Sequence, residues 1–117
     1  MTRQKYEGDW SQDVHNALDD FGVTQVGYVA DGGMKNIIAN CQANPNMHAI
    51  PLSSEEEGPC LATGAWLGGK KACIVMQSTG VGNCINTFSM SEVGQFPLLV
   101  LVSLRSSWGE GNRWQVP

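Results

Sequence analysis

Three adjacent glutamates, Glu55, Glu56 and Glu57, precede a segment rich in alanine and glycine. A carboxyl group can act as a general acid or base when a dry pocket raises its pKa toward neutrality. Neighbouring side chains diverge by about 100° on a helix and point to opposite faces of a strand. Only one of the three can therefore enter a single pocket. The alternative is that all three only favour a helix N-terminus through its dipole.

A loop of small residues, Ser78-Thr79-Gly80-Val81-Gly82-Asn83, is the second candidate for chemistry. Its glycines let the backbone approach a ligand closely, and free N–H groups at a helix start favour anions. No Gly-Lys-Ser/Thr follows, so the loop is not a P-loop. Without the support of Glu55, the better interpretation is a tight turn from strand to helix, with Asn83 exposed.

Apolar periodicity and turn residues predict helices that alternate with strands. We expect helices over residues 10–21, 34–41, 58–67 and 80–90, and strands over 23–29, 47–52, 72–77 and 96–103. Asp9 or Ser11 should cap the first helix and Gly22 should end it. The last two strands are continuous apolar runs, which is typical of a sheet covered on both faces. The predicted fold class is α/β, with three αβα layers around a parallel sheet.

Parallel sheets bind ligands at the carboxyl ends of their strands. Three predicted strand ends carry polar or small residues, namely Asp31-Gly32-Gly33, Ser53-Ser54-Glu55 and Ser78-Thr79-Gly80. We therefore expect these segments to lie at one edge of the sheet. Asp31 could equally serve only as a cap for the helix that begins near Met34.

Composition narrows the class of protein. The 117 residues fit one domain, residues 1–117, with 42% hydrophobic and 15% charged residues and a net charge of −4. The low charged fraction suggests a surface covered by a partner. No cluster of lysine and arginine is present, which disfavours nucleic-acid binding. The longest apolar run, residues 97–102, is too short to span a bilayer.

The four cysteines lie far apart and form no CxxC pair, which argues against a zinc site and a disulfide scaffold. The N-terminus also has no apolar signal core. We expect a reduced, cytoplasmic protein.

The segments Glu55–Gly69, Met76–Asn83 and Pro97–Arg105 resemble the pyrimidine-binding (Pyr) domain of thiamine-diphosphate-dependent decarboxylases, and most of all the sulfopyruvate decarboxylase α subunit. In that family, the activating glutamate lies nine positions before a glycine of an Ala-rich helix. Glu55 precedes Gly64-Ala65 by that spacing. The resemblance implies that Glu55, with Glu56 as second choice, bonds to the aminopyrimidine of thiamine diphosphate and activates it. The cofactor then carries the decarboxylation.

The same resemblance implies further site residues. In Pyr domains a similar small-residue loop lies near the aminopyrimidine, so cofactor contacts are expected from Ser78, Thr79, Gly80, Gly82 and Asn83.

The turn Val29-Ala30-Asp31-Gly32 is similar to the V-P-D-S turn of sulfopyruvate and phosphonopyruvate decarboxylases, which places Asp31 at the substrate end. Alanine and glycine replace the proline and serine of that turn, which leaves the exact substrate open. An anionic substrate needs a cation, and Arg105 is the expected one.

The family's Mg²⁺ motif, G-D-G followed by an Asn pair, is absent, because Gly8-Asp9-Trp10 has the wrong third residue. The resemblance therefore implies that a separate diphosphate-binding (PP) subunit holds Mg²⁺ in a hetero-oligomer, and no metal ligand is assigned here.

Pyr domains ordinarily continue for another strand or two and a helix, so we expect most of a domain rather than all of it. The expected function is that of a Pyr subunit of a 2-oxo acid decarboxylase, active only with its partner. The alternative is a truncated, non-catalytic interaction or regulatory module.

Overall fold

The structure is a computed structural model, and it describes residues 8–104. Helices and strands alternate along the chain, as the sequence predicts. The strands are β1 (Val23–Tyr28), β2 (His48–Pro51), β3 (Lys71–Gln77) and β4 (Val100–Ser103). The helices are α1 (Trp10–Phe21), α2 (Lys35–Ala43), α3 (Glu57–Leu67), α4 (Gly80–Asn83) and α5 (Ile85–Gly94), and a short 3₁₀ turn, η1 (Gly32–Met34), precedes α2.

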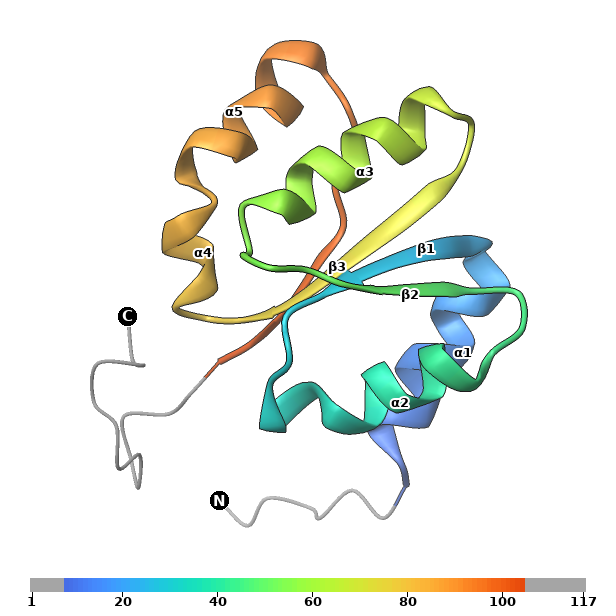
Figure 1. Ribbon diagram of the computed structural model, residues 1–117. Coiled ribbons are helices and arrows are strands. Elements are labelled where there is room, and N and C mark those ends of the chain that lie inside the picture. The colour runs from blue at the N-terminus through green and yellow to red at the C-terminus, as the bar shows by residue number, and fades with distance from the viewer. Residues whose placement is uncertain (1–7, 105–117) are drawn as a thin grey trace, which may run out of the picture.

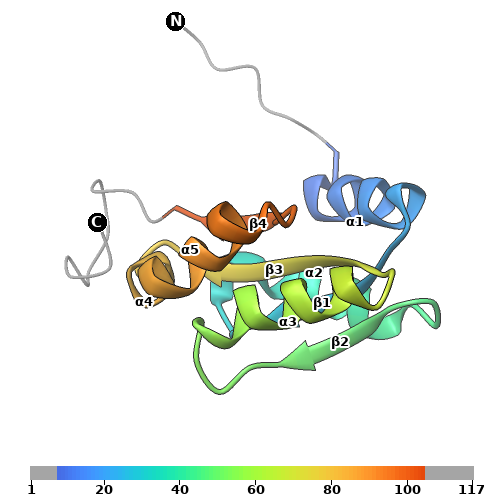
Figure 2. The same ribbon diagram turned by 90° about the horizontal axis from the view of Figure 1, so that it is seen from above.

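The four strands form a parallel sheet in the order β2-β1-β3-β4. Helices α1 and α2 cover one face of this sheet, and α3, α4 and α5 cover the other (Figure 1). In the view from above, α3 lies between β3 and β2 (Figure 2), and it is in contact with β1 and β3. The predicted three-layer α/β class is therefore confirmed. Within residues 8–104, no helix combines the length and apolar character that a membrane span requires.

The first helix begins and ends where the sequence predicts. The Asp9 Oδ1 atom accepts hydrogen bonds from the backbone N–H groups of Ser11 and Gln12, at 3.1 and 3.3 Å. Gly22 ends the helix in the left-handed conformation, with φ of 86°, which glycine adopts without steric cost. Asp9 rather than Ser11 is thus the cap.

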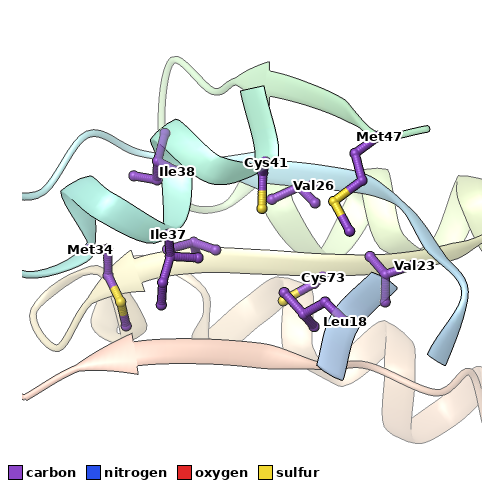
Figure 3. Close-up of a cluster of buried hydrophobic side chains, with 10 residues drawn as sticks. Leu18, Val23, Val26, Met34, Ile37, Ile38, Cys41, Met47 and Cys73 are labelled. Atoms are coloured by element: carbon purple, nitrogen blue, oxygen red, sulfur yellow. The ribbon is translucent and has the colours of Figure 1, made fainter. Parts of the chain in front are cut away.

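Two apolar clusters fill the layers on either side of the sheet. Between the sheet and α1 and α2, the buried cluster consists of Leu18, Val23, Val26, Met34, Ile37, Ile38, Cys41, Met47, Cys73 and Val75 (Figure 3). Strand β3 supplies both layers, because Cys73 and Val75 face this cluster while Ile74 and Met76 face α3 and α5. Burial on both faces explains why this strand reads as a continuous apolar run.

Most element boundaries lie within two residues of the prediction, and two elements differ by more. The helix expected over residues 80–90 is interrupted at Cys84, which has φ of −100° and ψ of −1°, and α5 then continues to Gly94. The strand expected over 96–103 begins only at Val100. Phe96 instead donates its N–H to the Ser91 carbonyl at the end of α5, and the proline that follows has no N–H to donate.

We predict that Gly58→Ala destabilises the fold, because a Cβ at this position would lie 2.6 Å from Ile74 Cγ2. The free energy of unfolding should fall by about 1–3 kcal/mol in chemical denaturation. Gly64→Ala, in the same helix, is the control, since no atom lies within 4 Å of its added Cβ. Removing this helical glycine should stabilise the protein by roughly 0.5–1 kcal/mol. Equal effects of the two changes would contradict the close contact between α3 and β3.

We also predict that stability falls in alkaline solution because of Cys73. Burial, then the neighbouring Cys41, raises the pKa of the Cys73 thiol from 9.0 to about 12. The raised folded-state pKa means that this contribution is fully present below pH 9 and is lost as the pH rises toward 12. Between pH 8 and pH 10 this thiol should lower the free energy of unfolding by about 1.4 kcal/mol. Denaturation curves of Cys73→Ala should lack that part of the decline; an unchanged decline would contradict the assignment.

Candidate functional site

The side chain of Glu55 lies against the loop that follows β3. Its Oε2 atom accepts a hydrogen bond of 2.9 Å from Asn83 Nδ2, across 28 residues of sequence. Glu55 is half-buried. Asn83 is exposed, yet its amide is engaged by the carboxylate. The structure therefore brings together the predicted glutamate and the end of the predicted loop.

Gly80 makes this approach possible. A Cβ at this position would lie 2.5 Å from Glu55 Cγ and 3.0 Å from Glu55 Oε1, so any larger residue would displace the glutamate. Gly82, in the same short helix, has no atom within 4 Å of its hypothetical Cβ. The first glycine is thus required by the side chain that it contacts, and the second is not.

The other two glutamates have different surroundings. Glu56 and Glu57 are both exposed. Glu57 begins α3, and its Oε2 accepts the N–H of Ser53 at 3.1 Å, which is an ordinary role for an acidic residue in a first helical turn. Glu55 is the glutamate that contacts Gly80 and Asn83, and the choice of Glu55 over Glu56 as the activating residue stays a prediction.

The residues at the start of the loop act through their backbone. Ser78 is buried, and its N–H donates to the Ser103 carbonyl at 2.9 Å, which ties the loop to β4. The carbonyls of Ser78 and Thr79 accept the N–H groups of Val81 and Gly82, each at 3.2 Å. These bonds close the turn and fix the position of Gly80 beside Glu55.

Asp31 lies at the same edge but has other partners. Its Oδ2 accepts from Ser103 Oγ at 2.5 Å and from the Gly33 N–H at 3.0 Å, so Asp31 caps η1 and joins the ends of β1 and β4. Ser103 was not among the predicted site residues, although it ends the strand predicted over residues 96–103. The predicted substrate cation, Arg105, lies outside the described residues.

A buried thiol lies beneath the glutamate. The pKa of the Cys84 thiol is raised. Burial is the largest cause, followed by the negative charges of Glu55 and Glu56 and by the thiol of Cys60. The Cys84 Sγ–H points to the Gly80 carbonyl at 3.4 Å. A buried thiol with a raised pKa stays protonated and does not act as a nucleophile.

The described part of the chain includes hollows on two sides of the sheet's ends. One, of about 580 Å³, lies beside Asp31 and is lined by Tyr28, Ala30, Asp31, Gly32, Lys35, Ile38, Ala39 and Gln42. The other, of about 380 Å³, lies at the amino ends of β3 and β4 and is lined by Phe21, Ala62, Trp66, Lys70, Lys71, Ala72, Pro97, Leu98 and Leu99. Within residues 8–104, no group of three or more His, Cys, Asp or Glu side chains could hold a metal ion.

The family model and the relatives that this chain matches point to the same family of proteins. Residues 9–116 match the family described as "Thiamine pyrophosphate enzyme, N-terminal TPP binding domain". Sulfopyruvate decarboxylase subunit alpha of Methanococcus maripaludis is 35% identical over 108 residues, which cover 92% of this chain and 65% of the relative. The corresponding subunit of Methanocaldococcus jannaschii is 34% identical over 105 residues, 89% of this chain and 62% of the relative. Phosphonopyruvate decarboxylase of Streptomyces viridochromogenes is 30% identical over 104 residues, 88% of this chain and 26% of the relative.

Among solved structures, an enzyme from Mycobacterium smegmatis, described as thiamin diphosphate-dependent, superposes with a TM-score of 0.73. The match covers 89% of this chain and 20% of that enzyme, at 15% identity. This likeness concerns the fold. The chain spans about two thirds of the length of the sulfopyruvate decarboxylase subunits that it matches, 65% and 62% for the two described above.

We predict that Gly80→Ala separates Glu55 from Asn83, because the added methyl group would occupy the space of the glutamate side chain. In the wild type, the side-chain amide resonances of Asn83 should shift in NMR spectra as Glu55 is protonated. This response should be lost in Gly80→Ala and kept in Gly82→Ala, whose methyl group meets open space. Loss of the response in both variants, or in neither, would contradict the described contact.

Proposed function

Because the chain belongs to the family of N-terminal thiamine pyrophosphate-binding domains, we propose that it is the cofactor-activating subunit of a thiamine-diphosphate-dependent 2-oxo acid decarboxylase. The observation that carries the proposal is the position of Glu55, held by Asn83 over Gly80 at the carboxyl edge of the sheet. This edge is where open parallel sheets bind their ligands.

The residues at this edge fit the aminopyrimidine of the cofactor. A ring nitrogen requires one carboxyl oxygen that can carry or accept a proton, in a fixed position. Asn83 engages Oε2 of Glu55, which leaves Oε1 to serve the ring nitrogen. Because Gly80 and Gly82 have no side chains, the ring can approach the backbone of this loop closely in this proposal.

Within this proposal the work of the chain is to hold a proton at Glu55. Thiamine diphosphate, when bound, supplies the carbon nucleophile and takes up the charge left by the departing carbon dioxide. Glu55 shares its proton with the ring nitrogen, and Asn83 keeps the carboxyl group from rotating away. The buried, protonated thiol of Cys84 adds no further negative charge beneath the glutamate.

A partner subunit is required for this chemistry. A carboxyl group keeps its proton near neutrality only when it is shielded from water, and Glu55 is only half-buried here. Ile85, directly after the loop, is 68% exposed and offers an apolar contact surface beside the site. We assign the grip on the diphosphate and Mg²⁺ to a PP subunit, in line with the description of the relatives as alpha subunits.

The substrate in this proposal is a 2-oxo acid with a strongly anionic tail. The printed names of the relatives specify sulfopyruvate and phosphonopyruvate, which carry a sulfonate and a phosphonate. Asp31 and Arg105 remain the proposed substrate-side residues.

The four cysteines are all free thiols, which supports the proposed cytoplasmic location.

We predict that Glu55→Gln lowers the turnover of the complex with the PP subunit by about 10²- to 10⁴-fold, because an amide cannot transfer the proton. Glu56→Gln is the matched control and should stay within about twofold of the wild type, since Glu56 is exposed and separate from the loop. Rates are measured from carbon dioxide release at saturating cofactor. Full turnover by Glu55→Gln would refute the proposal and favour the non-catalytic module.

A further inference from the structure

The carboxyl edge of the sheet has one lysine among the described residues. Of the three described cations, Lys70 and Lys71 lie at the start of β3, which is the opposite edge. Lys35 begins α2, four residues after Asp31. A strongly anionic group bound at the carboxyl edge would therefore find its positive charge, within residues 8–104, at Lys35.

Lys35 borders a space of suitable size. The residues that line the hollow of about 580 Å³ beside Asp31 include Lys35, Tyr28 and Gln42. Small-molecule sites commonly measure about 300–1,000 Å³. Lys35 is exposed, and no hydrogen bond or ion pair joins its ammonium group to another described residue. Its charge is available to a ligand in this hollow.

Tyr28 adds a neutral donor to the same hollow. Its hydroxyl oxygen accepts a hydrogen bond of 2.9 Å from Gln42 Nε2. Because Gln42 supplies the donor in that bond, the proton of the Tyr28 hydroxyl remains for another acceptor. An ammonium group and a hydroxyl together match a group with several anionic oxygens, such as a sulfonate or a phosphonate.

Asp31 also lines this hollow, and its carboxylate is held by donors from other segments. Its Oδ2 atom accepts from Ser103 Oγ at the end of β4 and from the Gly33 N–H. These donors reduce the repulsion that a nearby carboxylate exerts on an anion. They also keep Asp31 at the rim of the hollow.

We infer that the hollow beside α2 is the subsite for the anionic tail of the substrate, with Lys35 as its charged anchor and Tyr28 as a second donor. This inference rests on the proposed function, since it names the residues that select its substrate class. Lys35 binds the tail and takes no part in the proton transfer at Glu55, so its loss weakens binding and leaves the chemistry intact.

The test compares steady-state kinetics of the complex with its PP subunit, using sulfopyruvate, phosphonopyruvate and tail-less pyruvate as substrates. Lys35→Met should raise KM for the two tailed substrates by about 10- to 100-fold, the loss expected for a charged hydrogen bond, and change kcat less than about threefold. Lys35→Arg should restore most of the affinity. Lys70→Met, at the opposite edge, is the matched control and should leave KM unchanged. Thermal unfolding of every variant verifies the fold.

Several results would overturn the inference without touching the proposed function. One is an unchanged KM in Lys35→Met while Glu55→Gln remains inactive. Another is a selective rise in KM for Arg105→Met alone, which would move the anchor to Arg105. A third is Glu55-dependent turnover confined to 2-oxo acids without a charged tail. If Glu55→Gln keeps full turnover, the proposed function itself fails, and the inference fails with it.

Discussion

The candidate site depends on the close approach of one side chain to one glycine. The Glu55 carboxyl reaches the loop after β3 because Gly80 has no Cβ in its path, and the Asn83 amide then holds it. Glu55 follows β2 and Gly80 follows β3, so β1 separates the two strands that carry them. The contact therefore depends on the register of three strands, and this explains why a local feature needs the whole sheet to position it.

The sheet and its helices could be predicted from the sequence because their causes are local. Asp9 and Gly22 delimit α1, and apolar runs mark buried strands. The boundaries that differed have tertiary or backbone causes. Cys84, with φ of −100° and ψ of −1°, departs from regular helix geometry where its thiol packs in the core, and Phe96 bonds back to α5 instead of joining β4.

The site was predictable in its residue types and less so in its contacts. The resemblance to the family's glutamate-to-glycine pattern singled out Glu55 among three glutamates, and the parallel sheet implied a common edge. The bond between Asp31 and Ser103 spans 72 residues, so no local pattern indicates it. The position of Lys35 beside a hollow depends on how α2 packs against the sheet, which spacing alone does not determine. Contacts between side chains from distant segments could therefore not be predicted from the sequence.

The most direct measurement of the central claim is the ¹⁵N NMR signal of thiamine diphosphate labelled at the pyrimidine N1′, bound to the complex of this chain with a PP subunit. If Glu55 shares a proton with this nitrogen, the wild-type and Glu56→Gln complexes should show the same displaced resonance, and Glu55→Gln should shift it toward the value of the free cofactor. An N1′ resonance identical in all three complexes would contradict the account.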